Sequence, residues 1–472
     1  MPTSPNILFI MSDDHAAHAI SAYGSAINRT PHLDRIAREG MRLDACLCTN
    51  SICAPSRATI LTGTYSHVNG VLTLREGLDY RRRELPNVAS LLQGAGYQTA
   101  LVGKWHLGHQ PENHPQGFDF WRVLPGQGAY HDPEFYEMPE TPGGEVTRRA
   151  YPGYATDLIT DFALDWLKGR DPQRPFCLML HHKAPHRPWE PDAAHAGLYE
   201  DVEVPYPETF EDDYATRAQA AHVAHMRMEH LNERDTKGPP PEGLTLPQLR
   251  RWKYQRYIRD YLKCIASIDD NVGRVLDYLD QAGLSQDTVL IYTSDQGFFL
   301  GDHGWFDKRF FYEESLRMPF LVRYPAEIAP GSTEGRIVLN TDFAPLFLDY
   351  AGAAVPEAMQ GRSFRPLLRG EAPADWRSSM YYRYFMHLDS SHNTYAHYGL
   401  RSARYKLIYY YEPEPGPQEW ELFDLQADPR ELRNVYADPA YADVVRQLKA
   451  ELAQRRAEVG DTTNPWVEEP VG

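Results

Sequence analysis

Short apolar runs alternate with longer amphipathic segments along most of this chain, and that alternation constrains the fold more than any other feature. The first run, residues 6–12, is almost continuously apolar and ends in two acids, which is typical of a strand buried on both faces of a sheet. Further strands are expected at 97–102, 176–180, 288–293 and 319–322, and helices at 30–40, 86–94, 156–168 and 254–281. Strands that alternate with helices predict an α/β fold with a large, mostly parallel central sheet flanked by helices.

The pattern changes near residue 375, where helices no longer separate the strands. The expected elements there are tyrosine-rich strands at 380–385, 405–410 and 421–424 and a charged helix at 441–458. Adjacent strands without crossover helices predict a small antiparallel sheet with one covering helix. We therefore expect a large α/β domain of residues 1–374 and a C-terminal subdomain of residues 375–472. A polar stretch at 208–247 is expected to pass over the surface.

The chain carries 48 basic and 65 acidic side chains, for a formal net charge of −17. Nucleic acids and anionic membranes bind basic surfaces, so we expect neither as a partner. No apolar run approaches the roughly 18 residues of a membrane span, and the first run does not look like a secretory leader. Five scattered cysteines do not make a disulfide framework, which favours a reducing compartment. We expect a cytoplasmic protein, or a periplasmic or secreted one if a leader precedes this sequence.

Acidic side chains follow two of the expected strands. Asp13 and Asp14 end the first strand, and Asp295 and Gln296 follow the strand at 288–293. Ligand sites in open α/β sheets lie beyond the carboxyl ends of strands. Three carboxylates and an amide oxygen suit Ca²⁺ or Mg²⁺, and repelling carboxylates at one sheet edge need a cation between them. Taken alone, Asp13 and Asp14 are equally compatible with a turn that ends a strand.

The sequence Cys53-Ala-Pro-Ser-Arg57 precedes an apolar run, as a loop does when it enters a helix. A nucleophile there lies near free backbone N–H groups and the positive end of the helix dipole, both of which favour an anion. Arg57 lies one helical turn further on and can direct its guanidinium to the same place. A lone cysteine is more often a small buried apolar residue, but these five residues followed by Ala-x-x-x-Thr-Gly form a far more specific motif.

With this motif the chain resembles the type I sulfatases of the alkaline phosphatase superfamily. The resemblance runs from the acidic end of the first strand to Glu421-Leu-Phe-Asp-Leu425 near the C-terminus. It implies an alkaline-phosphatase-like fold in which residues 1–374 form the catalytic domain.

The resemblance also implies a modified nucleophile. In that family the cysteine of the motif is oxidised to formylglycine, so Cys53 would become the residue whose aldehyde hydrate attacks sulfur. One hydroxyl of the hydrate would displace the alcohol, and the second would then expel sulfate. Pro55 and Arg57 would belong to the signal that a formylglycine-generating maturation enzyme reads.

Further residues are assigned by the resemblance one at a time. Gly103-Lys104-Trp105-His106 matches a family stretch in which Lys104 would bind a sulfate oxygen and His106 would stabilise the formylglycine hydrate. His186, in the segment Pro185-His186-Arg187-Pro188, would hydrogen-bond the sulfate or protonate the leaving alkoxide. His181 and His182 are nearby rivals for that role.

Lys308 falls where the family has its second sulfate-binding lysine. Asp302 and His303 lie between Gln296 and this lysine in the sequence, so we expect both to border the site.

One divalent ion is implied as the cofactor, and the resemblance favours Ca²⁺ over Mg²⁺. Its ligands would be Asp13, Asp14, Asp295, Gln296 and the formylglycine made from Cys53. Many relatives carry Asn where this chain has Gln296, so the amide oxygen here lies on an arm one methylene longer.

The substrate is expected to be a small sulfated carbohydrate or an aryl sulfate. Segments 182–190 and 295–312 look more like bacterial carbohydrate sulfatases, including N-acetylglucosamine-6-sulfatase-like members, than like choline sulfatases. Four tryptophans could stack on a sugar or aryl ring, with core packing as the alternative for each: Trp105, Trp121, Trp189 and Trp305. A positive pocket in an acidic protein would favour small substrates over long polyanions. Its expected members are Arg57, Lys104, His106, His186, Lys308 and the divalent ion.

Two other functions are compatible with these motifs. Phosphonate monoester and phosphodiester hydrolases of the same superfamily use the same nucleophile, although Ser56 favours a sulfatase. A catalytically silent binder of sulfated glycans would lack a nucleophile or ligand position, and none is missing here. The sequence does not indicate an oligomeric state.

Overall fold

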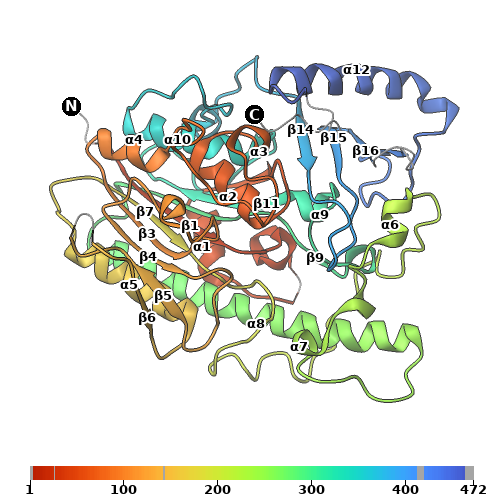
Figure 1. The fold of residues 1–472 in the computed structure, drawn as a ribbon, viewed down its shortest axis with the longest axis horizontal. Coiled ribbons are helices and arrows are strands. Elements are labelled where there is room, and N and C mark those ends of the chain that lie inside the picture. Colours follow the sequence, from red (N-terminus) through yellow and green to blue (C-terminus); the bar gives the residue numbers. More distant parts are fainter. Residues whose placement is uncertain (1–3, 26, 142–143, 412–418, 463–472) are drawn as a thin grey trace.

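The computed structural model describes residues 4–25, 27–141, 144–411 and 419–462 and arranges them around one large and one small β-sheet (Figure 1). Residues 463–472, which end the predicted C-terminal subdomain, lie outside the described part of the chain. No helix in these ranges is both long enough and apolar enough to cross a membrane.

Eleven strands form the large sheet, in the order β12-β2-β11-β8-β1-β7-β3-β4-β5-β6, with β13 paired to β2. They are β1 (Asn6–Ser12), β2 (Met41–Leu47), β3 (Gln98–Lys104), β4 (Phe120–Leu124), β5 (Glu134–Glu137), β6 (Thr147–Ala150), β7 (Phe176–His181), β8 (Thr288–Ser294), β11 (Arg317–Arg323), β12 (Ser332–Glu334) and β13 (Val338–Leu339). The central strands β8, β1, β7, β3 and β4 are parallel, while β11 and the β4–β6 edge are antiparallel. The predicted α/β fold with a mostly parallel central sheet is confirmed.

Helices cover both faces of this sheet (Figure 1). One face packs against α1 (Pro31–Glu39), α5 (Ala155–Gly169) and α8 (Leu246–Gln281), and the other against α2 (Cys53–Thr62), α4 (Val88–Gly94) and α10 (Phe343–Ala351). Because side chains alternate along a strand, Leu8 and Ile10 of β1 pack with the first set and Ile7 and Phe9 with the second. Shorter helices are α3 (Ser66–Asn69), α6 (Gln219–Val223), α7 (Glu233–Thr236), α9 (Glu313–Leu316) and α11 (Arg365–Leu368).

The small sheet is antiparallel throughout and consists of β14 (Ser379–Tyr384), β15 (His397–Ser402), β16 (Tyr405–Tyr410) and β17 (Glu419–Asp424). The helix α12 (Ala442–Glu458) packs Leu448 and Leu452 against Tyr381 and Leu407 of the sheet, as the sequence predicted. Strand β15 was not predicted, because Gly399 interrupts its apolar pattern. A Cβ at Gly399 would lie 2.3 Å from the Leu407 carbonyl oxygen, so the close approach of β16 requires glycine there.

The stretch at 208–247 differs from the prediction. It does not simply pass over the surface, because Ala220, Ala221, Met226 and Met228 are fully or almost fully buried. Small and flexible apolar side chains let an irregular segment pack into the core without the periodicity of a long helix. This segment, with α6 and α7, therefore forms part of the wall around β9 (Phe299–Leu300) and β10 (Phe306–Asp307), which pair as a two-stranded ribbon.

Candidate active site

Three carboxylates converge at the carboxyl end of the central strands. β1 and β8 pair in parallel with Ser12 opposite Ser294, so the residues that follow them emerge side by side. The Asp14 backbone N–H donates to Asp295 Oδ1 at 3.2 Å. Carboxylate oxygens of Asp13, Asp14 and Asp295 all lie within 4.8 Å of one another, and the three residues are fully buried. We call this group, with the side chains around it, the reaction centre.

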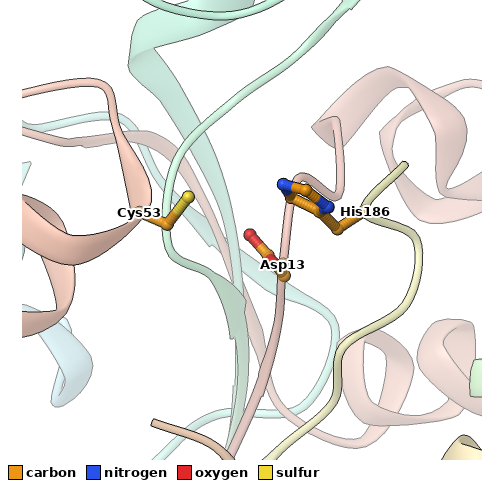
Figure 2. Close-up of side chains that lie close together, drawn as sticks. All are labelled: Asp13, Cys53 and His186. Carbon is orange, nitrogen blue, oxygen red and sulfur yellow. The ribbon is translucent and has the colours of Figure 1, made fainter. Parts of the chain in front are cut away.

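Cys53 is the first residue of α2, so its thiol lies at the N-terminal end of that helix. Its Sγ, a carboxylate oxygen of Asp13 and a ring nitrogen of His186 lie within 4.8 Å of one another. Figure 2 shows these three side chains directed into one space from separate segments. Burial raises the pKa of the Cys53 thiol to about 12, so the unmodified side chain stays protonated at neutral pH and is a poor nucleophile.

Each carboxylate of the reaction centre is paired with one cation: Asp13 with Lys104, Asp14 with Lys308 and Asp295 with Arg57. Lys308 Nζ donates to both oxygens of Asp14, at 2.6 and 2.7 Å, and Arg57 Nε donates to Asp295 Oδ2 at 2.9 Å. The three cations offset the three carboxylates. The positive pocket expected from the sequence therefore depends on its divalent ion, which was one of the expected members.

His186 is the histidine that enters the reaction centre. Its Nε2 lies 3.8 Å from Asp14 Oδ2, and its Nδ1 lies 2.7 Å from the backbone carbonyl of Arg187. His181 instead places Nδ1 3.2 Å from a backbone carbonyl, and neither ring nitrogen of buried His182 has a hydrogen-bond partner among the described residues. Of the three histidines, geometry therefore favours His186 for contact with a reacting group.

Gln127 was not predicted, yet it joins two of the expected residues. It lies in the loop after β4, where its Oε1 accepts from Lys104 Nζ and its Nε2 lies 3.3 Å from His106 Nε2. A glutamine in a loop without a motif carries no signal in the sequence, so only the fold identifies it.

Backbone conformation around the reaction centre is unusual. Asp14 and His106 adopt positive φ values of 68° and 60°, a region that few residues other than glycine enter. Gly103, just before Lys104, has φ of 103°, and a Cβ there would lie 1.9 Å from the His181 carbonyl oxygen. The close approach of β3 to β7 thus requires glycine beside the lysine, and strained backbone of this kind collects at functional sites.

The donor set of the reaction centre fits a divalent metal ion. Burial and the neighbouring carboxylates raise the pKa of Asp295 to about 7 and that of Asp14 to about 6, whereas Lys104 holds the pKa of Asp13 well below its usual value despite burial. Two buried oxygens, Asp13 Oδ1 and Gln296 Oε1, have no hydrogen-bond partner among the described residues. Gln296 instead uses its Nε2 to contact Asp14. Oxygen ligands of this number and type suit Ca²⁺ or Mg²⁺.

Asp302 and His303 were expected to border the site, and both make their ion pairs with residues outside the reaction centre. Asp302 pairs with His18 at 3.2 Å, and His303 Nδ1 lies 2.9 Å from Asp212. Their neighbours in sequence turn through the β9–β10 ribbon, so both side chains face partners outside the centre.

The four tryptophans pack in the core, which settles the alternatives left open by the sequence. Their exposed fractions are 4% or less: Trp105, Trp121, Trp189 and Trp305. Trp305 stacks on Tyr214 with ring centroids 5.3 Å apart, and Trp189 packs against Tyr257 at 4.4 Å. Rings covered in this way offer no face to a sugar.

Comparison with known protein families covers nearly the whole chain. Residues 5–353 match the sulfatase family, and residues 301–458 match the C-terminal part of N-sulphoglucosamine sulphohydrolase. An N-acetylglucosamine-6-O-sulfatase from Bacteroides thetaiotaomicron is 42% identical over 97% of this chain and 87% of its own length.

Solved structures agree with that match. One solved structure is described as in complex with its substrate D-glucosamine-2-N,6-O-disulfate. That protein is 41% identical to this chain, the match covers 99% of this chain and 100% of the other, and the TM-score is 0.91. A phosphonate monoester hydrolase of Agrobacterium radiobacter, at 22% identity, covers 96% of each chain and shares the fold with a TM-score of 0.76. The resemblance drawn from the Cys53 motif is therefore confirmed: the chain belongs to the sulfatase family, enzymes that hydrolyse sulfate esters.

Proposed function

We propose that this sulfatase removes the 6-O-sulfate of glucosamine-type sugars, with a formylglycine made from Cys53 as its nucleophile. The observation that carries the proposal is the convergence of Cys53, Asp13 and His186 within 4.8 Å, beside two further buried carboxylates. The substrate assignment is supported by the 42% identical N-acetylglucosamine-6-O-sulfatase and by the disulfated glucosamine bound in the similar structure.

The nucleophile position explains why modification is needed. As a thiol with a raised pKa, Cys53 would react slowly, whereas a formylglycine hydrate supplies a hydroxyl nucleophile and a second hydroxyl for release of sulfate. Cys53 is 1% exposed, so a maturation enzyme would have to act before this part of the chain folds. We infer that such an enzyme reads the Cys53-Ala-Pro-Ser-Arg57 segment.

The metal is proposed to be Ca²⁺, held by Asp13, Asp14, Asp295 and Gln296 together with the modified Cys53. When bound, it would neutralise the crowded carboxylates and draw negative charge from the sulfate oxygens. Asp13 Oδ1 and Gln296 Oε1 supply two ligand atoms that no donor in the described part of the chain uses.

The cations would then position the sulfate, and His186 would transfer protons. Lys104 pairs with Asp13 and Lys308 with Asp14, so both ammonium groups lie at the reaction centre and would bind sulfate oxygens there. His186 has its Nδ1 directed at a carbonyl, which fixes the hydrogen on that nitrogen and leaves Nε2 to exchange a proton in the reaction centre. His106, held by Gln127, lies beside Lys104 to support the modified Cys53. Arg57 fixes Asp295 and the Lys104 backbone carbonyl, which it contacts at 2.8 Å.

A substrate panel tests this function. The mass of the native protein is first measured by intact mass spectrometry, because conversion of Cys53 to formylglycine lowers it by about 18 Da. Sulfate release is then measured from N-acetylglucosamine-6-O-sulfate, D-glucosamine-2-N,6-O-disulfate, galactose-6-O-sulfate and p-nitrophenyl sulfate, alongside a phenylphosphonate ester. We expect the highest kcat/KM on a 6-sulfated glucosamine. Faster turnover of the phosphonate would assign the chain to the alternative hydrolases, and mass-shifted protein without any turnover would contradict the proposal.

A further inference from the structure

Lys183 is a buried lysine whose ammonium group has no hydrogen-bond acceptor among the described residues. It lies on the loop between β7 and His186, and it is 2% exposed. The ring of Tyr130 lies 4.4 Å from its Nζ. An ammonium group removed from water without an acceptor is costly, so a residue of this kind needs an explanation.

Comparison with the other buried lysines of this region makes the point sharper. Lys104 and Lys308 are buried to the same degree, and each is paired with a carboxylate. Ion pairing raises the pKa of Lys308, whereas burial and the nearby charge of Lys104 lower the pKa of Lys183 to about 8. Lys183 thus has no hydrogen-bond or ion-pair partner among the described residues, and Asp13 and Glu190 offset the fall in its pKa only from further away.

Lys183 lines a cavity of about 480 Å³ that adjoins the reaction centre. The connection is Gln127, which lines the cavity and also contacts both Lys104 and His106. Ligand cavities of roughly 300–1,000 Å³ accommodate small molecules, so this one has room for a sugar residue as well as a charged substituent.

Most other charges that line this cavity are already paired. Arg187 donates to Asp235 at 3.1 Å, and Glu134 pairs with Arg148. Glu190 and the exposed Arg234 also line the wall, and they are of opposite charge. Lys183 is therefore a buried cation of the cavity without a hydrogen-bonded counter-ion among the described residues, and Glu190 acts on it only from a distance.

From this arrangement we propose that Lys183 forms a second anion-binding position, which receives a carboxylate or sulfate of the substrate other than the sulfate that is hydrolysed. The inference rests on the proposed sulfatase function and deepens it, because it makes the enzyme selective for sugars that carry two anionic groups. The lysine gains its missing acceptor only when such a substrate is bound, so the interaction discriminates between singly and doubly charged sugars.

The test compares selectivity in Lys183→Met with that of wild type and of a matched control. Lys168→Met removes the same charge from an exposed position on α5. The kcat and KM for release of the 6-O-sulfate are measured on N-acetylglucosamine-6-O-sulfate, on D-glucosamine-2-N,6-O-disulfate and on a disaccharide that joins a uronate to 6-sulfated glucosamine. The last two separate a sulfate from a carboxylate as the second anion.

Wild type should prefer at least one doubly charged substrate. In Lys183→Met the ratio of kcat/KM for that substrate to kcat/KM for the singly charged one should fall about tenfold or more, mainly through KM, as expected for loss of a charge-assisted hydrogen bond. The same ratio should not change in Lys168→Met. A ratio that stays within twofold in Lys183→Met for both doubly charged substrates would overturn the proposal.

Two further measurements distinguish failure of the Lys183 proposal from failure of the proposed sulfatase function, and test whether Lys183 only stabilises the fold. If wild type releases sulfate from none of the sugars, the proposed function fails. Binding of N-sulfoglucosamine and of glucuronate by calorimetry then tests Lys183 alone, and equal affinities in wild type and Lys183→Met would refute the anion position. Thermal unfolding addresses the fold: because Lys183 has no acceptor, Lys183→Met should be at least as stable as wild type, and a marked loss of stability would assign the lysine to the fold instead.

Discussion

Two buried clusters of charge in this molecule differ in how many carboxylates they bring together. At the reaction centre, three carboxylates from two strand ends crowd within 4.8 Å of one another, and Asp13 Oδ1 and Gln296 Oε1 have no partner among the described residues. Under the small sheet, Lys406 lies between Glu313 and Glu431 at 2.9 and 2.6 Å, and Arg401 binds Glu313 through two hydrogen bonds.

The difference teaches how to tell a structural ion cluster from a functional one. Burial and charge density are similar in both, so neither property identifies the active site. In the Lys406 cluster two carboxylates share one lysine, and the cluster ties α9 to β15 and β16. The reaction centre instead brings three carboxylates within 4.8 Å of one another, which is the arrangement expected where a metal ion binds.

The largest expected effect separates the two clusters by activity. Cys53→Ala should lower kcat by about 10³-fold or more, because the nucleophile is lost, while the unfolding temperature changes little. Cys177→Ala, which removes another buried thiol on β7, is the matched control and should keep its activity. Undiminished sulfate release by Cys53→Ala would refute the nucleophile assignment.

The second prediction is the opposite for the Lys406 cluster: a loss of stability with little change in activity. Lys406→Met leaves Glu313 and Glu431 buried together without their shared cation, which should lower the free energy of unfolding by about 3–5 kcal/mol. Denaturant unfolding measures the loss, and kcat/KM of the folded protein should stay within about twofold. A fall in kcat without a loss of stability would mean that this cluster takes part in the reaction.

The third prediction concerns the cation at the reaction centre. Chelation should abolish sulfate release, and restoring the ion at about 100 times its dissociation constant should stabilise the protein by about 2.7 kcal/mol. Thermal unfolding with added Ca²⁺ or Mg²⁺ shows which ion binds more tightly. The unfolding temperature of Asp295→Asn should respond far less, whereas that of Lys406→Met should rise as much as that of wild type.

The smallest effect is expected from pH at a further structural pair. Although burial opposes the charge, the hydrogen bond from His303 to Asp212 and the Glu314 carboxylate 3.8 Å away raise the pKa of His303 to about 9. Because this folded pKa exceeds the ordinary value of 6.5, the stability that the pair contributes is complete below pH 6.5 and is lost as pH rises through 9.

His303→Gln should therefore be less stable than wild type at pH 6, with the difference shrinking toward pH 9.5. The effect is limited because Arg217 also pairs with Asp212, at 3.0 Å. A stability difference that does not depend on pH would show that the histidine is uncharged in the folded protein.

Much of the fold followed from local pattern. The strands β1, β7 and β8 were predicted within one residue because buried parallel strands are short, apolar and bounded by polar residues. Strands β2 and β15 were not predicted, since the apolar–charged alternation of β2 extends only from Met41 to Asp44 and β15 contains a glycine. The start of α8 at Leu246, eight residues before the predicted start, reflects a first stretch that is too polar to show an apolar face.

The sequence by itself determined where the reaction centre lies. Parallel strands end at one edge, so the acids after β1 and β8 had to lie together, and the Cys53 motif defined the start of a helix. Only the tertiary structure decided which histidine enters, that the tryptophans are covered, and that Gln127 and Lys183 adjoin the centre. The positions of these side chains depend on burial and on charges from segments far away in the sequence. No local sequence pattern indicates where such distant segments will pack.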